Sequence, residues 1–363
     1  MVKDTQVGGG ILDVAQRAGV SPSTVSRVLN GRMGSVTISP ATVERVRAAA
    51  LELRYRPNPA ARSLRTTTMQ TIGVIARDLA QPFSAEFLQA IYAVCRTRGY
   101  HVLVGNAEYH AGEGWTMGAL GDILGPERVD GLLLLGDVLP LTLNHEGMAA
   151  FVQEHRHVVT VGCRPILAGE IAISVDNTRG VTLALDYLFT LGHRSIAYIG
   201  PDQWPMSWED EQRWDAHARF MEAHGLPYGP AYSADVRDHD LAVAREALQR
   251  VLAAPARPTA AFVSNDMSAL LLLKAALTYG LRVPDDLSLV GFDGIQSAEL
   301  STPGLTTVRQ PIEAIGRYAA DVLLDKIAAI EPPPLPPEEA SGINPVVFPP
   351  TLVRRESACP PSL

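Results

Sequence analysis

The stretch GVSPSTVSRVLN, residues 19–30, decides the fold of the N-terminal part of the chain. Gly19 can end a preceding helix in the left-handed conformation, and Ser21 can cap a second helix whose first residue is Pro22. The apolar residues of this second helix share one face: Val25, Val28 and Leu29. The stretch therefore predicts a short helix that packs on its valines and exposes hydroxyl groups and one arginine.

The flanking residues predict a helix on each side of this stretch. Residues 11–18 (ILDVAQRA) have apolar residues at helical spacing, and Ser39-Pro40 repeats the cap-and-proline start. We expect the apolar sides of these two helices to be Ile11, Leu12, Val14, Ala15 and Ala18, and Val43, Val46, Ala50, Leu51 and Leu53. A tight glycine turn between two helices, with a third closing the core, is typical of a helix-turn-helix module. From composition alone, a small bundle that binds protein, or nothing, is the alternative.

Charge favours DNA binding by this N-terminal part. Residues 1–65 contain ten Lys and Arg against four Asp and Glu, a net charge of +6, although the whole chain has −8. Only the N-terminal part is therefore expected to approach phosphate groups. Residues 56–64 (RPNPAARSL) follow, and their helical run is too short to be stable alone. They are either a helical linker or a hinge that folds on DNA, with Leu64 as an apolar wedge in the minor groove.

From Thr71 onward, strand-like apolar runs alternate with helical stretches. The runs TIGVIA, VDGLLLLG, SIAYIG and LSLVGFD are separated by stretches such as AEFLQAIYAVCRTRG. This alternation predicts an α/β fold with parallel sheets covered by helices on both faces, and its repetition in the two halves predicts two similar lobes. Ligands bind beyond the carboxyl ends of parallel strands, so the cleft between the lobes is the expected binding site.

Missing motifs argue against several classes of protein. The chain has no signal-peptide pattern, no apolar run long enough to span a bilayer and no CxxC pair among its three cysteines. We therefore expect a cytoplasmic protein without membrane partners or cofactors. Dinucleotide, P-loop, nucleophile-elbow and zincin motifs are also missing, so an enzyme is not expected. His155 and His157 lack the Cys or carboxylate partners of a metal site, and Cys163 fits a packed residue better than a reactive thiol.

The chain resembles the LacI/GalR family of bacterial transcription regulators in segments that occur in order: DVAQRAGVSPSTVSRVLNG, RYRPNPAARSL, IGVIARDLAQPF, VDGLLLLG, LGHRSIAYIG, FVSNDMSALLLLKAAL, LSLVGFDG and STPGLTTVRQP. The resemblance implies a helix-turn-helix DNA-binding head over residues 8–56 and a hinge helix and linker over 57–70. It implies a two-lobed effector-binding and dimerisation core over 71–357, similar to periplasmic sugar-binding proteins. The implied function is a sequence-specific repressor. It would bind a partly palindromic double-stranded DNA operator as a homodimer and respond to a small effector, a sugar or sugar derivative.

The resemblance also implies site residues, position by position. The base-facing positions are Pro22, Ser23, Ser26 and Arg27, the phosphate-contacting ones are Ser21, Thr24 and Asn30, and the hinge positions in the minor groove are Ala61 and Leu64. Pro22 replaces a longer side chain of many relatives, so Arg27 is the main candidate for reading a base. The effector positions are Phe83, Ser84, Arg213, Asn265 and Asp293, and Asp266 is expected to orient its neighbours.

The proposed effector residues suit a polyhydroxy ligand. A carboxylate, an amide and an arginine fork can each pair with adjacent hydroxyl groups. Three tryptophans, Trp204, Trp208 and Trp214, lie within eleven residues. Trp204 and Trp208 are candidates for stacking on a sugar ring, although core packing is the alternative for all three. A sugar-processing enzyme or a plain solute-binding protein is the competing function, and the helix-turn-helix head argues against both.

Overall fold

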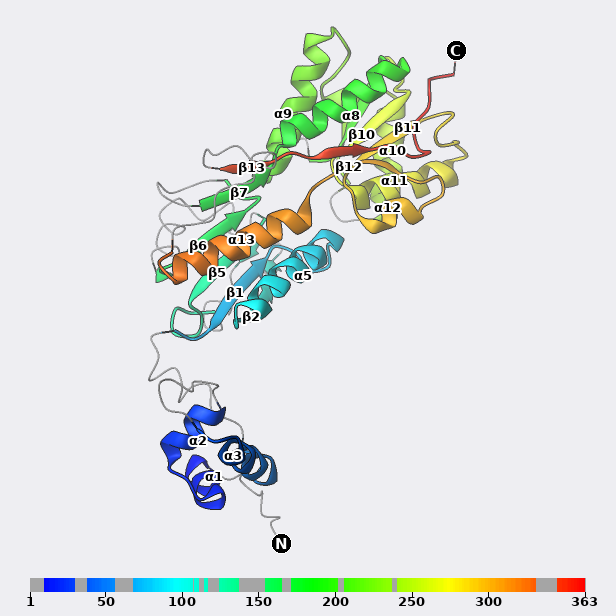
Figure 1. The fold of residues 1–363 in the computed structure, drawn as a ribbon. Coiled ribbons are helices and arrows are strands. Elements are labelled where there is room, and N and C mark those ends of the chain that lie inside the picture. Colours follow the sequence, from blue (N-terminus) through cyan, green and yellow to red (C-terminus); the bar gives the residue numbers. More distant parts are fainter. Residues whose placement is uncertain are drawn as a thin grey trace. The chain divides into compact units, whose positions relative to one another are not determined.

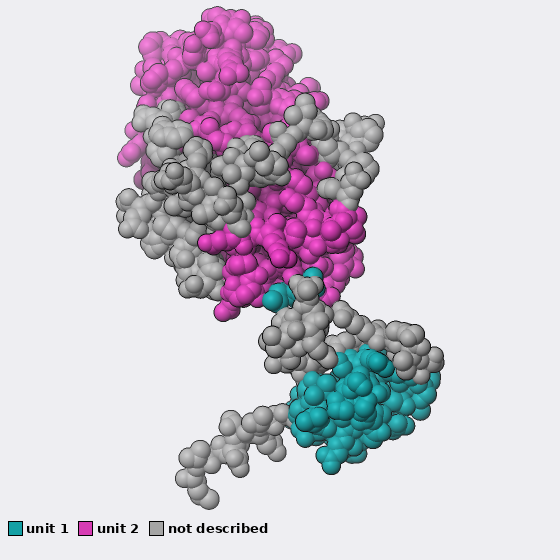
Figure 2. Space-filling model, turned by 90° about the vertical axis from the view of Figure 1, so that its left-hand side faces the viewer, with its two compact units in different colours: residues 1–69 teal, residues 70–363 magenta. Residues whose placement is uncertain are grey.

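The structure, a computed structural model, describes residues 10–29, 38–55, 68–106, 108–110, 114–116, 124–136, 154–164, 171–201, 206–236, 240–330 and 345–362. The chain forms two compact units, residues 1–69 and 70–363, which Figure 2 shows in different colours. Among the described residues, no helix is long and apolar enough to cross a membrane.

The first unit consists of helices α1 (Ile11–Ala18), α2 (Pro22–Leu29) and α3 (Pro40–Glu52). Gly19 ends α1 in the left-handed conformation with φ 65°, and the Ser21 and Ser39 hydroxyls accept hydrogen bonds from the backbone N–H groups three residues on. The predicted turn and both predicted caps are confirmed. The buried core of this unit is Val14, Ala15, Ala18, Val25, Val28, Val46, Ala49 and Ala50.

Two apolar positions expected in this core are not there. Leu12 is 69% exposed and Leu51 is 82% exposed, so the predicted apolar sides were wrong at these residues. Successive helical residues are separated by about 100°, which places Leu12 roughly 200° from Val14 on the opposite face of α1. Helix α3 likewise buries Val46, Ala49 and Ala50 and turns Leu51 to solvent.

The first lobe of the second unit contains a parallel sheet of six described strands in the order β13-β7-β6-β5-β1-β2. The strands are β1 (Thr71–Ala76), β2 (His101–Asn106), β5 (Gly131–Leu135), β6 (Val158–Val161), β7 (Ile171–Val175) and β13 (Val346–Phe348). Helices α5 (Pro82–Thr97) and α13 (Ile312–Ile327) pack against each other in this lobe (Figure 1). Gly316 allows this close approach, because a Cβ there would lie 2.9 Å from the Ala90 Cβ. A short antiparallel pair, β3 (Glu108–His110) and β4 (Gly114–Thr116), lies apart from the sheet.

The second lobe has a sheet in the order β14-β12-β11-β10-β8-β9, parallel except for the β12–β14 pair. Its strands are β8 (Ile196–Ile199), β9 (Ser233–Ala234), β10 (Ala260–Val263), β11 (Ser288–Asp293), β12 (Thr306–Arg309) and β14 (Thr351–Val353). Its helices are α8 (Asn177–Leu191), α9 (Trp208–Ala223), the 3-10 turn η1 (Pro230–Tyr232), α10 (Leu241–Leu252), α11 (Asp266–Tyr279) and α12 (Gln296–Leu300).

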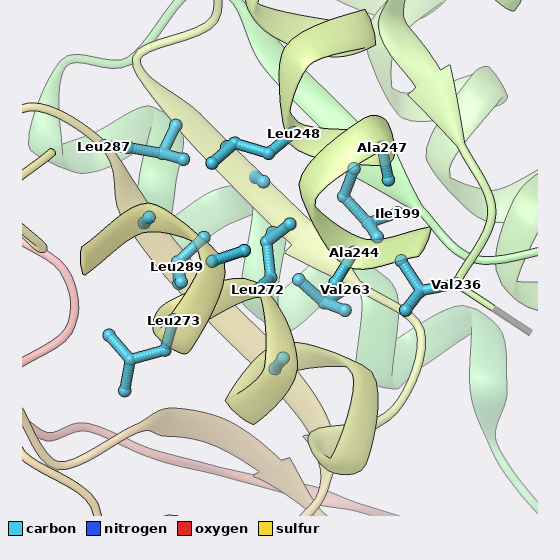
Figure 3. Close-up of a cluster of buried hydrophobic side chains, with 14 of the residues drawn as sticks. Ile199, Val236, Ala244, Ala247, Leu248, Val263, Leu272, Leu273, Leu287 and Leu289 are labelled. Carbon is cyan, nitrogen blue, oxygen red and sulfur yellow. The ribbon is translucent and has the colours of Figure 1, made fainter. Parts of the chain in front are cut away.

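The central strands β8, β10 and β11 of the second lobe are buried on both faces. In β8, Ile196 and Tyr198 join the cluster packed under α8 and α9, whereas Ala197 and Ile199 join the cluster under α10 and α11. Figure 3 shows the second cluster, in which Leu248 and Leu272 face the strand residues. Alternate residues of a strand point to opposite faces, so this pattern requires helices on both sides. The predicted α/β architecture is confirmed here.

The two predicted lobes are confirmed, but they do not correspond to two halves of the sequence. The chain passes between the lobes from β7 to α8, from β12 to α13 and from β13 to β14. Helix α13 and strand β13 therefore complete the first lobe, although both follow most of the second lobe in the sequence. These three crossing segments connect the two sheets in the described part of the core.

Candidate functional site

Helix α2 presents a polar surface on the first unit. Its residues Val25 and Val28 are buried, whereas Ser23 and Arg27 are exposed. At the start of the helix the Ser21 Oγ lies 2.8 Å from the Ser23 Oγ and 2.9 Å from the Thr24 Oγ1. Hydroxyl groups at a helix N-terminus are suited to contact phosphate groups, and an exposed arginine further along is suited to reach a base edge.

The other predicted DNA-binding residues differ in exposure, and three of them lie outside the described residues. Pro22 is exposed at the first position of α2, and Ser26 is partly buried. Asn30 in the helix-turn-helix region and Ala61 and Leu64 at the hinge lie outside the described residues. The assignment of all these side chains to DNA contacts stays a prediction.

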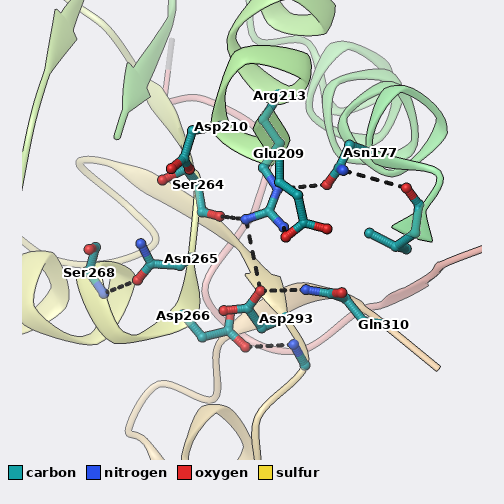
Figure 4. A network of polar contacts seen from close by, with 12 residues as sticks. Asn177, Glu209, Asp210, Arg213, Ser264, Asn265, Asp266, Ser268, Asp293 and Gln310 are labelled. Atoms are coloured by element: carbon teal, nitrogen blue, oxygen red, sulfur yellow. Dashed lines mark hydrogen bonds and ion pairs between the residues drawn. The ribbon is translucent and has the colours of Figure 1, made fainter. Parts of the chain in front are cut away.

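Arg213 is the centre of a buried polar network in the second lobe (Figure 4). It lies on α9 and is only 5% exposed. Its Nε donates to the Asn177 Oδ1 at 2.8 Å and its Nη1 to the Ser264 carbonyl at 2.7 Å. The guanidinium carbon lies 4.0 Å from the centre of the Phe292 ring, a cation–π distance. The guanidinium is therefore held rigidly by groups from three separate segments of the lobe.

Asp293 faces this guanidinium from the end of β11. Its Oδ1 lies 4.0 Å from the Arg213 Nη1 and accepts a 2.8 Å hydrogen bond from the Gln310 Nε2. Its backbone has φ 118°, which side-chain-bearing residues rarely adopt and which costs conformational energy. Burial raises the pKa of Asp293 to about 7, against the lowering effect of Arg213, and the Asp266 carboxylate raises it further.

Asp266 supports the turn that carries Asp293. Its Oδ2 accepts hydrogen bonds from the Gly294 and Ile295 backbone N–H groups, and its Oδ1 accepts one from the Thr307 hydroxyl. The side chain is fully buried, and burial raises its pKa as well. Asp266 therefore orients backbone and neighbours, which is the role that the sequence predicted for it.

Three of the five predicted effector residues come together, and two lie elsewhere. Asn265 follows β10, and its Oδ1 caps α11 by accepting from the Ser268 N–H, beside Arg213 and Asp293 (Figure 4). Phe83 and Ser84 begin α5 in the first lobe. The Ser84 hydroxyl donates to the Asp78 carbonyl at 2.8 Å, and Phe83 packs edge to face on Phe87.

The tryptophans separate into different environments. Trp214 packs against Tyr198 with ring centroids 4.9 Å apart and stacks on His217, so it is a partly buried residue packed against the apolar core of the lobe. Trp208 is the first residue of α9 and is partly exposed next to the network. Trp204 lies outside the described residues.

Sequence reasoning missed three members of the network: Asn177, Gln310 and Glu209. Asn177 follows β7 and Gln310 follows β12, so each is a polar residue just beyond the carboxyl end of a parallel strand. That position was a usable signal. Glu209 lies one helical turn before Arg213, and its Oε2 is 3.8 Å from the Arg213 Nη2. The i,i+4 spacing of an acidic and a basic residue was the signal for it.

Other candidate sites have less support. A cavity of about 780 Å³ is lined by residues of both lobes, among them Glu86, Gln310 and Phe348, but not by Arg213, Asn265 or Asp293. Within the described ranges, no three His, Cys, Asp or Glu side chains form a group that could hold a metal ion. The Cys163 thiol donates to the Gly136 carbonyl at 2.6 Å and is buried, as a packed cysteine would be.

Comparisons with known proteins agree with this arrangement. Residues 10–58 match the model of bacterial regulatory proteins of the lacI family, and residues 185–358 match a periplasmic binding protein-like domain. The repressor CytR of Escherichia coli K12 is 33% identical over 333 residues, which cover 90% of this chain and 92% of that protein. The repressor PurR of Erwinia tasmaniensis is 34% identical over 353 residues, 96% of each chain.

Solved structures give the same result for the whole chain. The Lac repressor dimer bound to operator and the anti-inducer ONPF matches with a TM-score of 0.78 and 26% identity, covering 97% of this chain and all of that one. The regulator CelR in complex with cellobiose matches with a TM-score of 0.66 and 28% identity, covering 96% of this chain and all of that one. The chain therefore belongs to the LacI family of bacterial regulatory proteins and is a DNA-binding transcription regulator with a helix-turn-helix head and a two-lobed, periplasmic-binding-protein-like core.

Proposed function

We propose that this regulator is a repressor whose operator affinity is controlled by a sugar or sugar derivative bound between the lobes. One observation carries the proposal: a rigid arginine faces a carboxylate and an amide that retain hydrogen-bonding capacity. The Asp293 Oδ2 and the Asn265 Nδ2 make no hydrogen bond within the described part of the chain. An acceptor and a donor so placed match the adjacent hydroxyl groups of a sugar. The relative CelR, solved with cellobiose, supports this ligand class.

The network is connected to two of the segments that cross between the lobes. Asn177 begins α8 directly after the β7 crossing and accepts from Arg213, and Gln310 lies at the β12–α13 crossing and donates to Asp293. A ligand that pairs with Asp293 competes with or strengthens these contacts. Ligand binding would then favour one arrangement of the lobes over another, which is the requirement for control of a distant DNA-binding head.

We assign operator contacts to the head and hinge. Ser21, Thr24 and Asn30 contact phosphates, Pro22, Ser23, Ser26 and Arg27 face bases, and Ala61 and Leu64 enter the minor groove. The exposed Ser23 and Arg27 and the hydroxyl cluster at the start of α2 support this assignment. Hydroxyls and backbone N–H groups fix position on the duplex, and Arg27 supplies the base-specific contact.

We also propose a homodimer that reads a partly palindromic operator. Large apolar side chains are exposed on several elements of the core: Tyr92 on α5, Leu103 and Val104 on the edge strand β2, Leu277 and Tyr279 on α11, and Leu300 on α12. Helices α5, α11 and α12 lie on the same side of the core in Figure 1. Large apolar side chains left exposed on these elements suit a protein interface. The Lac repressor dimer, a structural relative, supports a second copy of this chain as the partner.

The experiment that tests the function has two parts. A thermal-shift screen of the full chain against sugars, sugar phosphates and nucleosides identifies compounds that stabilise the core, because a ligand that binds the folded state raises its melting temperature. The operator is selected from a pool of random duplexes, and its affinity is measured with and without each stabilising compound. A chain that selects no sequence, or that converts the compound chemically, would contradict the proposal.

A further inference from the structure

The first turn of α9 places carboxylates around the arginine of the network. Glu209, Asp210 and Glu211 are all in this turn, and the Ser207 hydroxyl caps it by accepting from the Asp210 N–H. The Glu209 Oε2 lies 3.8 Å from the Arg213 Nη2 and the Asp293 Oδ1 lies 4.0 Å from the Nη1, so both carboxylates face one guanidinium (Figure 4). Asp210 is close enough to raise the pKa of Asp293.

Glu209 also reaches the first lobe. Gly162, directly after β6, has φ 68°, and a Cβ built on it would lie 3.1 Å from the Glu209 carboxyl group. The next acidic residue of the same turn, Glu211, forms an ion pair with Arg164 of the first lobe. The Glu209 carboxylate therefore lies between the two lobes, next to the hydrogen-bonding atoms that we assign to the effector.

At this end of the cleft the carboxylates outnumber the arginines that face them. Arg213 already has Glu209 and Asp293 beside it, and Arg164 already has Glu211. An anionic group that entered here would either displace a carboxylate from its arginine or be buried beside like charges, and both are costly in a site with little solvent. A hydroxyl or ammonium group meets carboxylate oxygens as acceptors and incurs neither cost.

We infer that Glu209 is a specificity-determining residue of the effector cleft, which makes the site select an uncharged or cationic ligand rich in hydroxyl or amino donors and exclude phosphorylated ligands. This inference rests on the proposed function and narrows its ligand class. Arg213, which is 5% exposed, is the cation with which a phosphate group would otherwise pair, whereas the Oδ2 of the buried Asp293 offers an acceptor to hydroxyl or amino donors.

The test compares the full-length wild type with the variants Glu209→Gln and Asp215→Asn. Asp215 is on the same helix but is exposed and paired with Arg219, so its substitution removes one negative charge away from the cleft. The probes are inorganic phosphate and three matched pairs: glucose and glucose 6-phosphate, ribose and ribose 5-phosphate, adenosine and AMP. Affinities are measured by calorimetry and thermal shift against a chloride control of equal ionic strength.

The wild type should bind no phosphorylated probe more tightly than its parent and should gain no stability from inorganic phosphate. Glu209→Gln keeps the side-chain length but leaves the Arg213 Nη2 with a neutral partner, so phosphate should bind at least tenfold more tightly than to the wild type. Asp215→Asn should behave as the wild type. The inference is wrong if the wild type prefers a phosphorylated probe, if Glu209→Gln gains no phosphate affinity, or if Asp215→Asn gains as much.

Two controls distinguish the role of Glu209 in phosphate binding from misfolding of a variant and from failure of the proposed function. Glu209→Ser repeats the charge removal without the amide, so it should also gain phosphate binding. A folded Glu209→Ser variant that gains none overturns the inference as well. Operator binding by the same preparations is measured in parallel. Loss of sequence-specific binding in the wild type would contradict the proposed function, whereas intact operator binding without phosphate exclusion would contradict only the role of Glu209.

Discussion

Replacing Arg213 by Met removes the cation at the centre of the core network and leaves its carboxylate partners in place. Asp293 is 7% exposed and would lose the charge that faces it at 4.0 Å. Asn177 and the Ser264 carbonyl would lose hydrogen bonds of 2.8 and 2.7 Å from the guanidinium. Met has a similar length and apolar character, so it fills most of the space next to Phe292.

The expected cost is that of a broken buried ion pair, about 3–5 kcal/mol at pH 8. For a unit of the size of the core, the entropy of unfolding converts this into a fall in melting temperature of roughly 5–8 °C. The cost depends on pH with a definite sign. Burial raises the pKa of Asp293 to about 7, so the carboxyl group is mostly neutral at pH 5.5 and no longer needs a counter-charge. The destabilisation should therefore be smaller at pH 5.5 than at pH 8.

Scanning calorimetry and tryptophan fluorescence measure the effect, because the partly buried Trp214 packs against the core of the same lobe. The double variant Arg213→Met/Asp293→Asn removes the unpaired charge and should recover about 1–3 kcal/mol at pH 8 relative to Arg213→Met. A melting temperature lowered equally at both pH values, or a double variant less stable than Arg213→Met, would refute the account of the network as a charge-paired site.

The remaining predictions concern the head, the hinge and a core histidine. Arg27→Ala should weaken operator binding by about 1–3 kcal/mol in an anisotropy titration and relax specificity at one base position; a uniform loss across all sequences would mean that Arg27 contacts only phosphate. Leu64→Ala should weaken specific but not non-specific DNA binding, and an equal loss of both would exclude a wedge. Burial lowers the pKa of His217 to about 4, so the folded state binds fewer protons than the unfolded state between pH 6.5 and 4. The free energy of unfolding should therefore fall by about 3 kcal/mol as the pH drops through this range. In His217→Leu the melting temperature should decline less over the same pH range; an unchanged decline would show that other groups cause it.

The local elements of this fold were predictable from sequence because their signals are local. Caps and prolines located α2 and α3, and apolar runs located β1, β5, β8 and β11. Helix phase was less certain, because Leu12 in α1 and Leu51 near the end of α3 fit an apolar pattern but face solvent. The eight residues of α1 make barely two turns, so one misplaced residue there changes the assigned face.

The order of the strands and the full network were not predictable in the same way. Periodicity identifies a strand but does not say which sheet it joins, and β13, with three residues, completes the first lobe from the far end of the chain. Arg213, Asn265 and Asp293 were found through family resemblance. Asn177 and Gln310 follow strands, which is a local signal for a site residue, but their pairing with Arg213 and Asp293 is identified only by the fold.

The central claim is that Asp293 links a ligand to DNA affinity without being needed for the DNA-bound fold. The most direct measurement is an operator titration of the wild type and Asp293→Asn, with and without a compound that stabilises the wild-type core. Asparagine keeps the shape of the side chain and tolerates its positive φ. We expect the variant to bind the operator as the wild type does and to lose the response to the compound. A variant that still responds fully, or that loses operator binding when no compound is present, would contradict the account.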